Sequence, residues 1–167
     1  MASILNVDKI RRAAGTTDAI TIDSSDRVDA RVPMFHANRS SSYTMTNGSV
    51  FVYDNVVFDT DSWYSTSTGR YTPQKAGYYH FTGQASLAST NNAHYMVPRL
   101  RVNGVYKIDV VGIPNSSTYP RPQVSGIFYL NGSTDYVDVY VIFTGATAAW
   151  TDIAGNNFFG HYLGSGS

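Results

Sequence analysis

The chain has 167 residues, 43% of them hydrophobic, with no cysteine and a formal net charge of zero. This length supplies one full hydrophobic core but not two ordinary domains, and the lack of cysteine excludes a disulfide framework, a thiolate metal site and a cysteine nucleophile. The twelve basic residues are dispersed, so the sequence predicts no nucleic-acid partner.

Residues 1–30 differ from the rest because they contain no aromatic side chain, and we interpret them as an arm. They hold no long apolar run, so we expect neither a signal peptide nor a membrane span, and synthesis in a cytoplasm. The spacing of apolar residues at 3–15 is compatible with a short helix capped by Ser3 and also with an extended arm. Residues 19–22 are predicted to be extended. The arm cannot bury its own apolar groups, so it either docks on a partner or remains a disordered leader. The docking residues would be Ile4, Leu5, Val7, Ile10, Ile20 and Ile22.

From residue 32 onward the composition favours strands, because the chain has no Glu and three Lys against thirteen Tyr and eight Phe. Apolar stretches alternate with turn signals at roughly ten-residue spacing, which is typical of an all-β sandwich or barrel. Strands are expected at residues 32–36, 50–53, 56–58, 95–102, 105–108, 125–130, 136–144 and 158–163. Asn103-Gly104 and Asn131-Gly132 carry the dipeptide that most strongly signals a hairpin. The expected units are therefore an arm at 1–30, a head at 31–164 and a short tail at 165–167.

Residues 69–81 combine a glycine and proline turn with a strand in which Tyr79 and Phe81 alternate with polar neighbours. Residues 136–143 show the same alternation, with Val137, Val139 and Val141 on one face. The opposite face of residues 136–143 is aromatic, and it meets either another subunit or only solvent.

Four segments together resemble the globular head shared by complement component one-q and the tumour necrosis factor superfamily. They are residues 32–39, residues 55–73, residues 76–81 and residues 157–163, which follow one another in the order of that family. The resemblance implies a ten-stranded jelly-roll sandwich that assembles as a homotrimer, with aromatic and apolar faces meeting near a threefold axis. We assign to this trimer interface Tyr79, Phe81, Tyr136, Tyr140, Ile142 and Phe159.

The chain departs from this family in three respects: it has no collagen-like stem, no secretion signal, and no acidic turn at 131–135. A secreted animal protein is therefore disfavoured. The first ten residues also resemble leaders of bacteriophage structural proteins that carry such heads, which favours synthesis in a bacterial cytoplasm and residence in a virion.

Residues suited to catalysis are sparse, so we expect no enzyme. The four histidines share no metal-ligand spacing, and no nucleophile motif occurs. Asp59 and Asp61 supply carboxylates, and some relatives of this fold bind calcium, but further ligands are absent from this stretch, so we assign no metal site and no cofactor. Loop residues that could contact a carbohydrate or a protein are Trp63, Tyr64, Tyr119, Arg121 and Trp150, although each could equally anchor its own loop.

Two functions follow as hypotheses. In the first, the trimeric head is a capsid cement or decoration protein whose arm grips other virion proteins, above all the major capsid protein. In the second, the head is the tip of a tail fibre that binds a glycan or protein on the host surface. A polysaccharide depolymerase would need a carboxylate pair that the sequence does not reveal.

Overall fold

The computed structural model describes residues 9–10, 20–22, 24–25, 28–86, 95–112, 121–144, 149–150 and 155–166. The chain divides into two compact units, Met1–Val32 and Pro33–Ser167. All the regular elements formed by the described residues are β-strands. Within this part of the chain no helix is long and apolar enough to span a membrane.

The N-terminal unit holds a small antiparallel sheet of order β1-β2-β3. Its strands are β1 (Lys9–Ile10), β2 (Ile20–Ile22) and β3 (Val28–Ala30). The predicted extended segment at 19–22 is confirmed over Ile20–Ile22, and Lys9 and Ile10 adopt the extended alternative because they pair with Thr21 and Ile20. Ile10 and Ile22 are exposed, Ile20 is half-buried, and the docking residues Ile4, Leu5 and Val7 lie outside the described residues.

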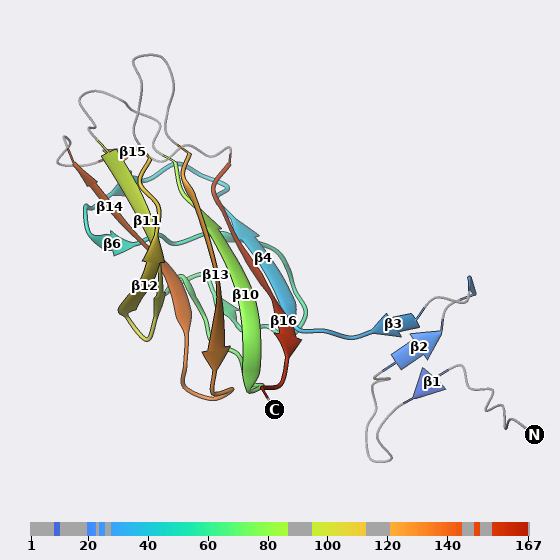
Figure 1. The fold of residues 1–167 in the computed structure, drawn as a ribbon. Helices are drawn as coiled ribbons and strands as arrows, with labels where there is room; N and C mark the ends of the chain where they lie inside the picture. The colour runs from blue at the N-terminus through green and yellow to red at the C-terminus, as the bar shows by residue number, and fades with distance from the viewer. Residues whose placement is uncertain are drawn as a thin grey trace, which may run out of the picture. The chain divides into compact units, whose positions relative to one another are not determined.

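The second unit is a sandwich of two antiparallel sheets, drawn as two layers in Figure 1. The first sheet has the order β13-β10-β16-β4-β7. Its strands are β4 (Met34–Asn38), β7 (Asn55–Asp59), β10 (Gly77–Gln84), β13 (Gln123–Leu130) and β16 (Asn157–Gly164). We call it the front sheet.

The second sheet, which we call the back sheet, has the order β12-β11-β14-β9-β8, with β6 also paired to β14. Its strands are β6 (Ser49–Val50), β8 (Tyr64–Ser65), β9 (Arg70–Tyr71), β11 (Tyr95–Val102), β12 (Val105–Asp109) and β14 (Val137–Thr144). A separate pair joins β5 (Thr44–Met45) to β15 (Ala149–Trp150). The expected all-β sandwich is confirmed, and several of its strands in the described residues are only two residues long.

The core between the two sheets is largely aromatic. Phe35 lies at its centre, 4.2 Å from the ring of Tyr71 and 4.9 Å from that of Phe158, as measured between ring centroids. The predicted inward set of β14 is confirmed, because Val137, Val139, Val141 and Phe143 are all fully buried. Because each aromatic ring is large, a small number of them fills the space between the two sheets. The chain can therefore build a core although it has only five Leu.

The two Asn-Gly dipeptides have different roles. Asn103 and Gly104 have φ values of 54° and 76° and close the β11–β12 hairpin, as predicted. Asn131-Gly132 instead connects β13 of the front sheet to β14 of the back sheet, so the hairpin expected there is wrong. The Asn131 side chain stabilises this corner, because its Oδ1 accepts hydrogen bonds from the backbone of Ser133, Thr134 and Asp135.

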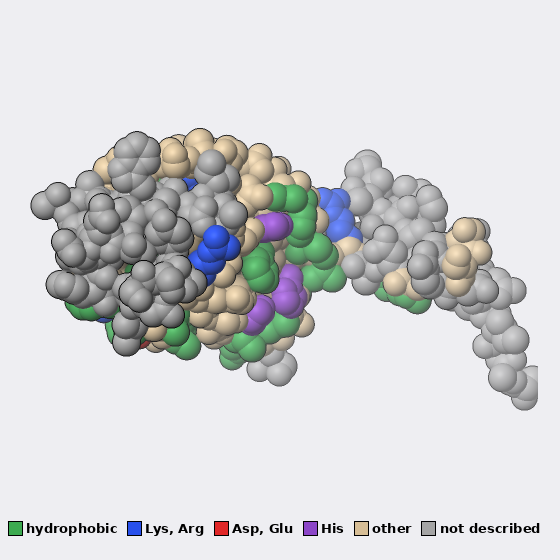
Figure 2. All heavy atoms as spheres, turned by 90° about the horizontal axis from the view of Figure 1, so that it is seen from above, with side chains coloured by type: hydrophobic (Ala, Val, Ile, Leu, Met, Phe, Trp, Pro, Cys, Tyr) green, Lys and Arg blue, Asp and Glu red, His purple; other side chains and the backbone are tan. Residues whose placement is uncertain are grey.

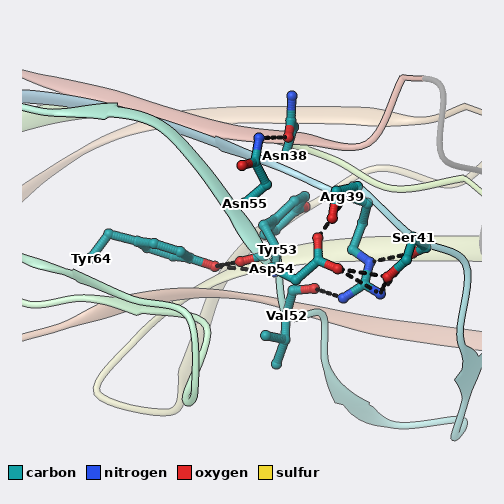
Figure 3. Close-up of polar contacts among 9 residues, drawn as sticks. Asn38, Arg39, Ser41, Val52, Tyr53, Asp54, Asn55 and Tyr64 are labelled. Atoms are coloured by element: carbon teal, nitrogen blue, oxygen red, sulfur yellow. Dashed lines mark hydrogen bonds and ion pairs between the residues drawn. The ribbon is translucent and has the colours of Figure 1, made fainter.

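A buried arginine fixes the chain that leaves β4 (Figure 3). Arg39 donates from Nη1 to Val52 O at 3.0 Å and from Nη2 to Ser41 O at 2.7 Å, and its Nη2 lies 3.3 Å from Asp54 Oδ2. Burial alone would raise the pKa of Asp54, but hydrogen bonds from Ser40 and Ser41 and the charge of Arg39 hold it below the ordinary value of 3.8. This cluster satisfies its own polar groups, so we interpret it as structural.

Candidate functional site

The front sheet carries almost no charge. None of its five strands contains Lys or Arg, and its one acidic residue is Asp59 at the end of β7. The back sheet, in contrast, carries Arg70, Arg99, Arg101 and Asp138 on its strands. Interface cores are depleted in charged residues and enriched in aromatic ones, so the front sheet has the composition of a surface that another protein covers.

Strand register arranges the outward side chains of the front sheet in rows. A row of amides crosses all five strands at one end, and comprises Asn55, Asn38, Asn157, Gln84 and Gln123. The next row holds Phe58, His36, Phe159, Thr82 and Ser125, and the one after it Met34, His161, His80 and Ile127. Tyr78 and Tyr129 pair at the far end of β10 and β13. The outward surface therefore changes from polar to aromatic along the strands.

The rows beyond the amides form one exposed surface, which we call the aromatic face. It comprises the apolar, aromatic and histidine side chains of these rows, together with Leu163 near the end of β16, which is 49% exposed. They are Met34, His36, Phe58, Tyr78, His80, Ile127, Tyr129, Phe159, His161 and Leu163. Its large apolar members remain accessible, for example Ile127 at 58% and Tyr129 at 52%. Figure 2 shows the histidines gathered among hydrophobic side chains on this part of the surface. An exposed apolar patch of this kind marks an interaction site.

Three histidines from three strands lie on the aromatic face, and two of them, His80 and His161, are adjacent. The ring centroids of His80 and His161 are 5.3 Å apart, and that of His36 lies 5.9 Å from Phe159. His80 Nε2 is 2.7 Å from Ser125 Oγ. Burial, together with the nearby His161, lowers the pKa of His80 below its ordinary value of 6.5. His80 is therefore uncharged at neutral pH and gains a proton only in acid.

Among the described residues no group of three or more His, Cys, Asp or Glu side chains is placed to hold a metal ion. The carboxylate of Asp59 accepts from the backbone nitrogens of Asp61 and Tyr64, at 3.3 and 2.7 Å, so it stabilises the turn before β8.

The predicted trimer-interface residues do not form one surface. Tyr79 and Phe81 are fully buried in the core, so their side chains do not reach the outer surface of the subunit. Their neighbours Tyr78 and His80 point outward, because side chains alternate across a strand. Phe159 does lie on the aromatic face, 36% exposed.

The other three predicted interface residues, Tyr136, Tyr140 and Ile142, lie on or beside β14 of the back sheet and are half-buried. Arginines cover both tyrosine rings, with the Arg70 guanidinium 4.0 Å from the centroid of Tyr136 and that of Arg101 4.1 Å from Tyr140. These contacts occupy the ring faces within the subunit.

The predicted ligand residues are also dispersed. Tyr64 is buried, and its hydroxyl is 3.1 Å from both the nitrogen and the oxygen of Tyr53, so it anchors the core (Figure 3). Trp63 packs on the core beside Tyr71. Arg121 is exposed, whereas Tyr119 and the side chain of Trp150 lie outside the described residues.

Sequence reasoning missed Tyr78, His80, Ile127, Tyr129 and His161. A usable signal was present, because the segments at 77–84, 123–130 and 157–164 all lack charged residues. Strands exposed to solvent on one face normally place charges there, so three uncharged strands indicate that both faces are covered.

Comparisons with known proteins agree with this architecture. A family model described as the C1q domain matches residues 34–131, whereas no curated protein matches the chain. The globular domain of the zebrafish complement 1qA protein is similar at 15% identity and a TM-score of 0.63, over 80% of this chain and 97% of that one. Murine APRIL at pH 5.0 is similar at 12% identity and a TM-score of 0.61, over 80% and 100%. The Eiger TNF of S. frugiperda is similar at 11% identity and a TM-score of 0.57, over 81% and 94%. These structures share the jelly-roll sandwich.

Proposed function

Because this chain belongs to the C1q domain family, we propose that it is a non-enzymatic head that assembles as a homotrimer through the aromatic face. The observation that carries this proposal is the front sheet, whose strands lack Lys and Arg while exposing rings from β7, β10, β13 and β16.

A second copy of the chain is the partner that best suits this face. Identical charged surfaces repel one another, but an uncharged surface can pack against copies of itself without that cost. Closed rotational symmetry buries the same patch on every subunit and leaves no open end. Exposed tyrosines such as Tyr78 and Tyr129 bring large apolar area and a hydroxyl to such a contact, and Tyr is enriched at interfaces.

Light scattering or native mass spectrometry of the purified chain tests the trimer directly. We expect a trimer, and we expect Ile127→Lys to shift it to monomer because a buried, unpaired ammonium is costly. The matched control is Val105→Lys, at a residue of similar exposure (59%) on β12 of the back sheet, which should leave the trimer intact. A monomeric parent protein, or a trimer that persists in Ile127→Lys, would contradict the proposal.

We further propose that the trimer decorates a bacteriophage virion, with the N-terminal unit docking on other virion proteins such as the major capsid protein. The resemblance of the first ten residues to phage leaders supports this, as do the exposed Ile10 and Ile22 of the small sheet. Three weak contacts from one trimer act together, because tethering raises the effective concentration of the second and third. The tail-fibre tip is the alternative location for the same trimer.

Deleting residues 1–29 tests the docking role. This deletion lies within the first compact unit, so we expect the head to remain a folded trimer that no longer joins the particle. Labelled protein on intact particles separates the two locations, because a decoration protein covers the shell and a fibre tip lies at the tail. Normal incorporation of the truncated protein would rule out docking by the arm.

A further inference from the structure

A pocket of about 300 Å³ opens on the back sheet, which does not carry the aromatic face. Its lining residues are Tyr95, Val97, Arg99, Asp109, Val111 and Ile142. We propose that this pocket binds a single neutral pyranose unit of a glycan, recognised through two adjacent hydroxyl groups.

Strand register places the lining side chains together. Tyr95, Val97 and Arg99 are alternate residues of β11, on the side opposite to the buried Met96 and Leu100. Val97 pairs with Ile142 on β14, and Arg99 pairs with Asp109 on β12. The pocket therefore has one apolar part and one charged part, both held by paired strands.

The ion pair in this pocket retains hydrogen-bonding capacity. Arg99 Nε lies 3.3 Å from Asp109 Oδ2 and is buried without a hydrogen bond, and its guanidinium carbon lies 5.0 Å from the ring centroid of Tyr106. On the same sheet, Arg101 donates from Nε and Nη2 to the two carboxylate oxygens of Asp138, at 2.7 and 2.9 Å. Both carboxylate oxygens of Asp138 are therefore bound by Arg101. Arg99 and Asp109 form no such two-bond pair, so the terminal nitrogens of Arg99 and the carboxylate of Asp109 can still donate to and accept from a ligand.

Adjacent sugar hydroxyls match this pair, because each hydroxyl both donates and accepts a hydrogen bond. One can accept from the guanidinium of Arg99 while the next donates to the carboxylate of Asp109. The C–H face of the ring would pack on Tyr95 and on the aliphatic side chains beside it. A charged sugar fits less well, since the charges of Arg99 and Asp109 already balance. The volume is at the low end for ligand pockets, as expected for one ring.

Titration of the full-length protein with methyl glycosides of glucose, galactose and mannose, followed by NMR, tests the proposal. At least one should shift the backbone signals of Tyr95, Val111 and Ile142 in a saturable manner, whereas glucuronic acid and N-acetylneuraminic acid should bind more weakly. We expect Arg99→Met and Asp109→Asn each to weaken binding about tenfold, because each removes a charge-assisted hydrogen bond.

Arg70→Met is the matched control, because Arg70 is on the same sheet but does not line the pocket. It should bind as the parent does. If Arg99→Met does not fold, Ile142→Phe fills the pocket without changing the ion pair and should also abolish binding. The proposal is overturned if no neutral glycoside shifts these signals, if the acidic sugars bind more tightly, or if both pocket variants bind as the parent does.

Discussion

At the scale of single residues, Asp138 is the most constrained charge in the described part of the head. It is fully buried, yet it is flanked by Arg101 and, at 3.9 Å, by Arg70. The hydrogen bond from Arg101 to Asp138 raises the pKa of the guanidinium, which remains charged at all accessible pH values. Alternation along residues 136–143 places Asp138 on the outward face, opposite to Val137 and Val139. Its side chain is nevertheless buried, because Arg70 and Arg101 from the neighbouring strands cover it.

Replacing Asp138 by Ala should lower the free energy of unfolding by about 3 kcal/mol, because it leaves two cations without their shared partner. Urea denaturation of the two proteins at neutral pH measures the difference. Asp109→Ala is the control, since its pair with Arg99 is partly exposed and should contribute less than about 1 kcal/mol. Equal effects of the two substitutions would contradict the special role of Asp138.

At the scale of elements, the sequence predicts where strands lie better than it predicts which strands pair with each other in a sheet. The strand at 95–102 matches β11 in both bounds, because alternating apolar residues and an Asn-Gly turn are local signals. The residues at 50–53 form a strand only up to Val50, since the chain then turns toward the Arg39 cluster. The Asn131-Gly132 dipeptide is typical of a hairpin turn, but here it joins two different sheets. This outcome depends on the strands that pair with β13 and β14, which are distant in sequence and leave no local signal.

The candidate site was harder to predict than the strands. Alternation divides β10 into two sets, one with Tyr79 and Phe81 and one with Tyr78 and His80, and both sets contain aromatic rings. Aromaticity therefore could not decide which set faces the core. The three histidines are 44 or more residues apart in sequence, so only the pairing of β4, β10 and β16 brings them together.

Close packing of β16 on β10 makes a prediction about glycine. A Cβ atom at Gly160 would lie 2.6 Å from the Phe81 ring and 2.7 Å from the His80 carbonyl oxygen, whereas at Gly164 it would meet no atom within 4 Å. Gly160→Ala should therefore destabilise the head by about 1–3 kcal/mol, and Gly164→Ala should be nearly neutral. The melting temperatures of the two variants compare the same substitution at two positions of β16. Equal melting temperatures would contradict the prediction and show that β16 can move away from Phe81.

At the scale of the whole molecule, the two sheets separate charge from aromatic surface. The back sheet holds Arg70, Arg99, Arg101 and Asp138, while the front sheet has no Lys, Arg, Asp or Glu in the rows of β4, β10, β13 and β16 between its amides and the tyrosines at its far end. In the proposed trimer the back sheet remains accessible, so the sugar pocket could act three times in one assembly, which multiplies a weak affinity. None of the residues that form the aromatic face is Lys, Arg, Asp or Glu, and protonation of His80 would place a charge on it.

Acid should therefore weaken the proposed trimer. The titratable groups on the aromatic face are His36 on β4, His80 and Tyr78 on β10, His161 on β16 and Tyr129 on β13. The pKa of His80 is already lowered below 6.5 by burial and by His161, and covering the face disfavours the charged form further. The trimer then binds fewer protons than free subunits, so association is strongest above the ordinary histidine pKa and is lost as the pH falls through the lowered pKa of His80.

Sedimentation of the protein at about pH 7.5 and at about pH 5 measures this effect, and we expect the trimer to dissociate at least tenfold more readily in acid. The double substitution His80→Gln and His161→Gln keeps polar side chains but removes His80, whose pKa is lowered, together with its neighbour. It should remain trimeric at both pH values. A parent trimer that is equally stable at both pH values would show that subunit association leaves His80 and His161 accessible to water.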